Sequence, residues 1–218
     1  MWDPIVIEPT EKPRACLIML HGLGASNQDF SNLAYELEIP ALPMRFIFPQ
    51  APMKPVTLNG GMRMPAWYDL IAIEVNAPQD AGGIYESQAI LETLIQEQLQ
   101  QGIPSEHIVL AGFSQGGALA LHTALRYPKR LAGVFGLSTY LPLMDRLKEE
   151  RSKESERLGI VLYHGTLDTV VSLALAQASY VAFDALGVSY EWITYPMAHT
   201  VCQQELLHMK QWIQRRLT

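Results

Sequence analysis

The chain has 218 residues, a net charge of −6, and 49% hydrophobic against 17% charged residues. This composition is typical of a globular protein with a large core and excludes a disordered chain. The acidic balance, without any lysine or arginine cluster, disfavours nucleic acid as a partner. The length suits one α/β unit, so we predict a single domain over residues 1–218.

The first fifteen residues are rich in acids and prolines and lack a basic start that leads into an apolar run. We therefore expect no signal peptide and a cytoplasmic location. No stretch reaches the roughly 18 to 20 apolar residues of a membrane span, so no stable membrane insertion is expected. Cys16 and Cys202 are too few for a disulfide framework and are interpreted as small buried hydrophobic residues.

In the first third of the chain, short apolar runs predict strands at Ile5–Ile7, Ala15–Leu20 and Met44–Phe48. The second strand leads into His21-Gly22-Leu23-Gly24. A helix is predicted after this loop, because apolar residues recur there at three- and four-residue steps. Ser26 or Asn27 can cap its start, and it stops at Pro40.

A proline-rich stretch from Pro49 to Gly82 shows little helical or alternating pattern, although it carries many apolar residues. Loops of this length inside a compact domain are uncommon and are often functional. The part from Met53 to Ile73 either packs on the core or lines a site for apolar groups.

Helices and strands alternate through the rest of the chain. The predicted helices are Ile84–Gln101, the stretch after Ser114 to Tyr127, Met144–Glu156, Ser172–Leu186 and a final one through Leu206, Met209, Ile213 and Leu217. The predicted strands are Ile108–Leu110, Leu131–Leu137, Ile160–Tyr163 and Val188–Tyr195. We interpret Met144–Glu156, which is highly charged, as a solvated helix. The alternation predicts a mostly parallel sheet with helices on both faces, and such sheets carry their sites at the carboxyl ends of the strands.

The stretch around Ser114 has the pattern Gly-x-Ser-x-Gly between an apolar strand and a helix rich in small residues. In a sharp strand-to-helix turn, the residues two before and two after the apex must be nearly without side chain, and Gly112 and Gly116 meet that demand. Ser114 is therefore the predicted nucleophile, exposed at the apex of the turn.

A serine nucleophile in this arrangement needs an acid and then a histidine, each just past a later strand end. His199 follows the last predicted strand and is the expected base, whereas His164 stands at a strand end beside a glycine and is interpreted as structural. Asp168 is the acid between Ser114 and His199 that lies in a loop just past a strand. His199 would remove the Ser114 proton, and Asp168 would orient the imidazole.

Two backbone amides are expected to stabilise the oxyanion of the tetrahedral intermediate. One belongs to Gln115, the residue after the nucleophile, and the other to the earlier glycine-rich loop, where Leu23 is preferred over Gly24. No cap domain can be inserted between Ser114 and Asp168, so the apolar residues of the stretch Met53–Ile73 are expected to cover the acyl group, together with two residues of the neighbouring strand-end loops. The expected acyl contacts are Leu23, Trp67, Leu70, Ile71 and Val171.

Several segments together resemble the phospholipase/carboxylesterase family, which includes acyl-protein thioesterases. They are His21-Gly22-Leu23-Gly24, Pro49-Gln50-Ala51-Pro52, Met64-Pro65-Ala66-Trp67-Tyr68-Asp69, Gly112-Phe113-Ser114-Gln115-Gly116-Gly117, His164-Gly165 with Asp168, and His199 with Cys202. The resemblance implies an α/β-hydrolase without a cap domain that hydrolyses carboxylic esters or thioesters, with Ser114, Asp168 and His199 at the triad positions.

The expected function is that of a serine hydrolase which forms an acyl-enzyme from a small-molecule ester or lipid-like acyl substrate, with lysophospholipids among the options. The alternative is a non-catalytic protein that uses the same fold to bind an apolar ligand or partner. A serine peptidase is a weaker option, because no extra domain is there to select peptides. The acids and histidines show no metal-ligand spacing, so neither a metal nor a cofactor is expected. The oligomeric state stays open, with a homodimer as one option.

Overall fold

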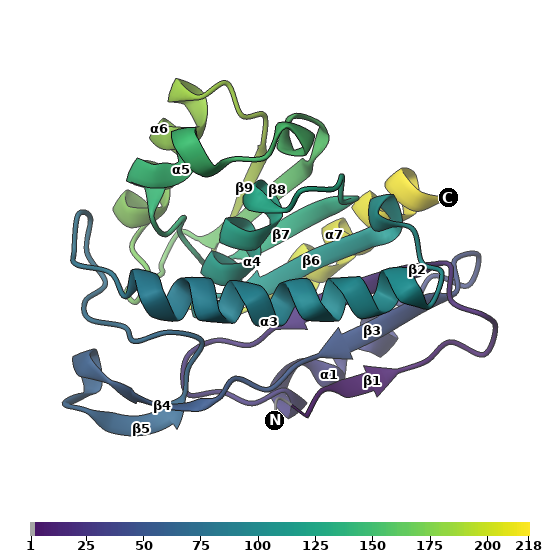
Figure 1. Cartoon of the computed structure of the whole chain (residues 1–218), viewed down its shortest axis with the longest axis horizontal. Helices are drawn as coiled ribbons and strands as arrows, with labels where there is room; N and C mark the ends of the chain where they lie inside the picture. Colours follow the sequence, from purple (N-terminus) through teal and green to yellow (C-terminus); the bar gives the residue numbers. More distant parts are fainter. Residues whose placement is uncertain (1–2) are drawn as a thin grey trace.

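The computed structural model describes residues 3–218, and its main feature is a seven-stranded sheet (Figure 1). The strand order is β1-β3-β2-β6-β7-β8-β9, with only β1 antiparallel to its neighbour. The strands are β1 (Ile5–Ile7), β2 (Ala15–Leu20), β3 (Met44–Phe48), β6 (Ile108–Phe113), β7 (Gly133–Leu137), β8 (Gly159–Gly165) and β9 (Glu191–Tyr195). The predicted mostly parallel sheet is confirmed, and the carboxyl ends of β6, β7, β8 and β9 meet at one edge.

Helices cover both faces of this sheet, as predicted. One face packs on α3 (Ala81–Gln100), α4 (Gln115–Arg126) and α6 (Leu173–Ala185). The opposite face packs on the short helices α1 (Gln28–Ser31) and α2 (Leu33–Glu36) and on α7 (Gln203–Leu217). Figure 1 shows α3 in front of the sheet and α7 behind it. All six residues of β2 are buried, because a central parallel strand is covered on both sides.

The proline-rich stretch contains regular structure that its sequence does not indicate. Met53–Val56 (β4) and Met62–Pro65 (β5) pair as an antiparallel hairpin, which lies apart from the main sheet (Figure 1). The turn between them uses Gly60 and Gly61, both at positive φ (64° and 81°), where glycine has no steric penalty. The expectation of an irregular loop throughout Pro49–Gly82 is therefore wrong for the hairpin.

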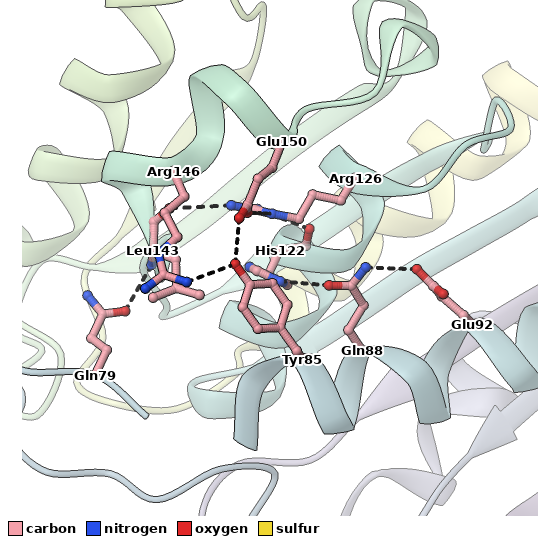
Figure 2. Close-up of polar contacts among 9 residues, drawn as sticks. All are labelled: Gln79, Tyr85, Gln88, Glu92, His122, Arg126, Leu143, Arg146 and Glu150. Atoms are coloured by element: carbon pink, nitrogen blue, oxygen red, sulfur yellow. Dashed lines mark hydrogen bonds and ion pairs between the residues drawn. The ribbon is translucent and has the colours of Figure 1, made fainter. Parts of the chain in front are cut away.

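The charged stretch between β7 and β8 is not one solvated helix, and that prediction is wrong. It is broken into a 3₁₀ turn at Met144–Arg146, the single turn α5 (Leu147–Glu150) and a second 3₁₀ turn at Lys153–Arg157. Figure 2 shows how the last residue of α5 is held: Glu150 accepts hydrogen bonds from Arg126 Nε (2.7 Å) and from the Tyr85 hydroxyl (2.6 Å). The mostly buried Arg126 guanidinium thereby gains the partner carboxylate that a buried charge needs.

Between the end of β7 and the start of β8, residues 138–158 form only loops and these short turns. This segment leaves no inserted domain above the carboxyl edge of the sheet in the described part of the chain, which agrees with the predicted fold without a cap. None of the helices in residues 3–218 is long and apolar enough to cross a bilayer.

Candidate active site

Ser114 lies at the apex of the turn between β6 and α4, with φ 53° and ψ −119°. A non-glycine residue at positive φ is strained, and such strain is held only where the surroundings determine it. Side chains on the two flanking glycines would clash: a Cβ on Gly116 would lie 2.5 Å from the His21 carbonyl oxygen, and one on Gly112 would collide with the Gly116 backbone. The sequence pattern therefore produces the strained turn that it predicts, with Ser114 partly exposed at its apex.

The end of β7 holds this turn from the side. The Ser114 amide donates to the Leu137 carbonyl (2.9 Å), and the Thr139 hydroxyl donates to the Ser114 carbonyl (2.7 Å). Thr139 is a supporting residue that sequence reasoning did not find. The adjacency of β6 and β7 in the sheet is the signal that identifies it, and that adjacency is a tertiary property.

Asp168 follows β8, and its buried carboxylate accepts hydrogen bonds at both oxygens. Oδ1 accepts from the amides of Val170 and Val171, both at 2.9 Å, and Oδ2 lies 2.7 Å from His199 Nδ1. Because an ionised carboxylate only accepts, His199 Nδ1 carries the proton of that bond. The other ring nitrogen, Nε2, is then the basic one.

His199 lies in the loop between β9 and α7, with its side chain 17% exposed. Its ring packs against Phe113, with 4.6 Å between ring centroids, and it lines the same cavity as Ser114. No hydrogen bond between the Ser114 hydroxyl and the His199 ring is among the contacts of residues 3–218. Such bonds are often long in unliganded enzymes and tighten with substrate.

His164 also lies near Asp168, with Nε2 3.6 Å from Oδ2. The same nitrogen is 2.8 Å from the Val171 carbonyl oxygen, which only accepts, so Nε2 carries a proton and is already committed. Burial lowers the pKa of His164, which keeps the ring neutral. Its position agrees with the structural role inferred from sequence.

The glycine-rich loop after β2 places Leu23 beside the turn that carries Ser114. The amide of Gly24 donates to the Pro65 carbonyl at 2.8 Å, so that amide is engaged. Leu23 lines the cavity beside Ser114 and Gln115, and Gln115 is the first residue of α4, where amides lack a partner within the helix. Of the two loop residues considered, Gly24 has its amide committed to Pro65, and Leu23 is the one that lines the cavity.

A cavity of about 340 Å³ opens beside Ser114. Apart from Asp29 and the site residues, its wall is mainly apolar. The lining residues are Gly22, Leu23, Ala25, Asp29, Phe30, Leu70, Ile73, Phe113, Ser114, Gln115, Tyr140, Val170, Val171 and His199. Three expected acyl contacts, Leu23, Leu70 and Val171, lie in this wall.

Two other expected acyl contacts lie elsewhere. Ile71 lines a separate small cavity under the loop 69–80, which shares Leu70 and Tyr140 with the wall beside Ser114. Trp67 is only 1% exposed, because its indole N–H bonds to the His21 carbonyl oxygen (2.8 Å) and draws the ring into the core. The expectation that these two side chains touch the acyl group is corrected accordingly. Sequence reasoning missed Phe30 and Tyr140, whose predicted helix and loop show no signal for a cavity wall.

The fold and the arrangement of Ser114, His199 and Asp168 define the class of α/β-hydrolases. The profile of the phospholipase/carboxylesterase family matches residues 1–217. The chain belongs to this family, and it is an enzyme, a serine hydrolase of carboxylic esters. The non-catalytic alternative is set aside.

Individual relatives agree with this assignment. The chain is 41% identical over 177 residues to acyl-protein thioesterase 1 of Schizosaccharomyces pombe, which covers 81% of this chain and 79% of that protein. It is 36% identical over 209 residues to acyl-protein thioesterase 1 of Yarrowia lipolytica, with 93% and 92% covered. Among solved structures, Arabidopsis thaliana SOBER1 has a TM-score of 0.90 at 32% identity, with 94% of this chain and 100% of that chain covered.

Proposed function

We propose that the protein hydrolyses carboxylic esters and thioesters of apolar acyl groups, with Ser114 as nucleophile, His199 as general base and Asp168 as the orienting acid. In the first half-reaction, Ser114 Oγ attacks the acyl carbonyl carbon while His199 Nε2 takes the hydroxyl proton. The tetrahedral intermediate collapses when that proton passes to the leaving oxygen or sulfur. Water then repeats the sequence on the acyl-enzyme and releases the carboxylic acid.

The observation that carries this proposal is the 2.7 Å hydrogen bond between His199 Nδ1 and Asp168 Oδ2, with His199 on the wall of the cavity that also contains Ser114. The bond places the basic nitrogen on the other side of the imidazole ring. We further propose that the amides of Leu23 and Gln115 bind the oxyanion, which is supported by the engagement of the Gly24 amide with Pro65.

The apolar wall supports an acyl chain as the group that enters the cavity. Leu70, Val171 and Phe30 provide apolar surface beside the serine, and such surface favours acyl over charged groups. Thioesters are included because the relatives are named acyl-protein thioesterases. Whether the acyl group arrives on a small alcohol, a lysophospholipid or a protein cysteine is the part that experiment must decide.

The test is a panel of oxygen esters and thioesters with acyl chains of two to sixteen carbons, measured below and above the critical micelle concentration. We expect turnover of dissolved short and medium esters without a jump at a lipid interface, because no lid covers the site within residues 3–218. Activity should disappear in Ser114→Ala and after treatment with a fluorophosphonate. A rate that appears only above the micelle concentration, or an active Ser114→Ala protein, would contradict the proposal.

Leu70 and Ile71 provide a matched pair for the acyl wall, since they are adjacent but only Leu70 lines the cavity beside Ser114. A charge in the wall must be desolvated by a longer acyl chain. We expect Leu70→Asp to raise KM for octanoyl esters more than for acetyl esters, and Ile71→Asp to have the smaller selective effect. Equal effects on both esters at Leu70 would show that the acyl chain lies elsewhere.

A cytoplasmic location is also proposed, supported by the two cysteines, Cys16 and Cys202, which are unpaired in the structure. Cell fractionation tests it. Light scattering after gel filtration decides between a monomer and the homodimer that the sequence left open.

A further inference from the structure

Trp67 is buried at a junction between the loop after β2, the nucleophile turn and α3. Its indole Nε1 donates to the His21 carbonyl (2.8 Å), at the start of the glycine-rich loop. Its backbone amide donates to Gln115 Oε1 (3.0 Å), and its carbonyl accepts a short hydrogen bond from Ser87 on α3. One residue therefore contacts the loop after β2, the nucleophile turn and α3, although it does not line the cavity.

The side chain of Gln115 completes this junction from the other side. It is 2% exposed, and its Nε2 donates to the Tyr68 carbonyl (2.8 Å) while its Oε1 accepts from Trp67. A side-chain amide carries both an acceptor and a donor, so it can accept from one peptide group and donate to the next. Gln115 is also the residue whose backbone amide is proposed for the oxyanion, so its side chain anchors the residue that donates.

The second proposed donor, the Leu23 amide, lies between two fixed points of its loop. Upstream, His21 is held by Trp67 at its carbonyl and by its ring, whose Nδ1 bonds to the Gly22 carbonyl (2.8 Å) and whose Nε2 accepts from the Ala51 amide (3.0 Å). Downstream, the Gly24 amide is bound to the Pro65 carbonyl. The Gly22 carbonyl only accepts, so Nδ1 carries a proton, whereas Nε2 accepts from an amide and carries none. His21 is therefore neutral, in agreement with the lowering of its pKa by burial.

We propose that Trp67 and the side chain of Gln115 are positioning residues, which set the separation and direction of the Leu23 and Gln115 amides. This inference rests on the proposed serine-hydrolase function. Both proposed donors are linked to Trp67. The Leu23 amide is linked through the His21 carbonyl, which binds the indole N–H, and the Gln115 amide is linked through its own side chain, which binds the Trp67 backbone amide. Oxyanion donors act at 2.7–3.1 Å from the developing charge, so a small shift of either loop weakens binding of the transition state more than binding of the substrate.

The decisive variant is Trp67→Phe, which keeps an aromatic ring but removes the donor to the His21 carbonyl. Misplacement of catalytic groups by about 1 Å can cost on the order of 100-fold in rate. We expect kcat to fall by about 10- to 100-fold while KM for a short aryl ester stays within about twofold. Affinity for a trifluoromethyl ketone, which forms a tetrahedral adduct with the serine, should fall by a similar factor. Rates are counted per active site, from titration with a fluorophosphonate.

Trp212→Phe is the matched control. Trp212 is also buried (7% exposed) and donates from its indole, to Glu191, but it lies on α7 at the opposite face of the sheet. It should lower the melting temperature without changing kcat per active site.

A second variant, Gln115→Met, keeps the backbone amide and the side-chain length but removes both amide contacts, and it should reproduce the kcat effect if Trp67→Phe does not fold. Normal kcat per site in a folded variant, or an effect confined to KM, would overturn the positioning role. Failure of the proposed function itself looks different, because the wild-type protein would then resist the fluorophosphonate.

Discussion

Two histidines face the Asp168 carboxylate from two regions of the molecule, and they differ in what else they touch. His199, in the loop between β9 and α7, bonds to Oδ2 at 2.7 Å and keeps its side chain 17% exposed on the cavity. His164, near the end of β8, is 3.6 Å from the same oxygen and fully buried. Its Nε2 is bound to the Val171 carbonyl, and its Nδ1 has no partner within residues 3–218.

The difference shows that closeness to a carboxylate does not make a histidine a general base. A base must present an unprotonated nitrogen to the reacting atom. His199 can do so because Asp168 holds its Nδ1 proton, whereas His164 has one nitrogen engaged and the other enclosed. The two regions therefore divide the work: the loop after β9 carries the proposed proton transfer, and the end of β8 holds the turn that carries Asp168 and Val171.

The largest expected effect tests the difference between His199 and His164 directly. His199→Ala should lower kcat by about 10⁴ or more, as should Ser114→Ala, because either change removes the proposed proton transfer or the nucleophile. His164→Asn should cost less than about tenfold in kcat. The measurement is kcat on a short aryl ester, with circular dichroism to show that each variant is folded. Equal losses in folded His164→Asn and His199→Ala would end the distinction between the two rings.

Asp168→Asn changes the partner that both histidines face. An amide placed with its NH₂ toward His199 would donate to Nδ1 and leave the imidazole in the wrong tautomer, so kcat should fall by about 10³- to 10⁴-fold with a small change in KM. Steady-state kinetics on the same ester measure this. The carbonyl oxygen of the amide can still accept from Val170 and Val171, so the turn should stay folded, which the melting temperature checks. A loss below tenfold would show that Asp168 does not orient the base.

Glu205 lies where the loop that carries His199 joins α7, and its Oε2 accepts from the Cys202 amide (3.3 Å). Burial raises the pKa of Glu205 to about 8. The unfolded chain loses this proton near the ordinary glutamate value, so the stabilising contribution is complete at pH 4 and is lost as the pH rises to about 8. Glu205→Gln should therefore melt at least about 5 °C above wild type at pH 9 and show a smaller gain at pH 5.

Calorimetry at the two pH values makes this measurement. Glu36→Gln is the control, because Glu36 is exposed and its carboxylate accepts a hydrogen bond from Gln203 of α7, while Lys210 of α7 bonds to its backbone carbonyl, which the change keeps. An equal gain at pH 5 and pH 9 in Glu205→Gln would show that the carboxyl of Glu205 is not the titrating group.

The smallest expected effect concerns the stability that His164 contributes. Burial lowers its pKa, so the unfolded chain takes up a proton below about pH 6.5 that the folded protein does not. Stability should fall as the pH drops below that value, and His164→Asn should reduce the slope of melting temperature against pH. His122, whose pKa burial lowers to about 3, contributes in the same direction and keeps part of the slope. An unchanged slope in His164→Asn, with His107→Asn as control, would contradict this account.

Much of the fold and the candidate site follows from local sequence. Continuous apolar runs such as Ala15–Leu20 predict buried parallel strands, and the structure confirms them. The glycines around Ser114 predict a strained turn because the clash that Gly112 relieves is local, against the Gly116 backbone, although the clash that Gly116 relieves is against the end of β2. Positions just past strand ends select Asp168 and His199, because parallel strands bring those ends to one edge whatever their separation along the chain.

Other features depend on contacts between segments distant in sequence, and only the tertiary structure decided them. The charged segment after β7 places Glu150 against Arg126, a partner on another helix. The engagement of the Gly24 amide by the Pro65 carbonyl, which supports the preference for Leu23 already drawn from the sequence, is a contact of this kind, and so are the bonds of Trp67 to His21 and Gln115. No periodicity or spacing encodes these pairings, because a hydrogen bond between distant segments is specified by three-dimensional packing, to which each segment contributes only one partner.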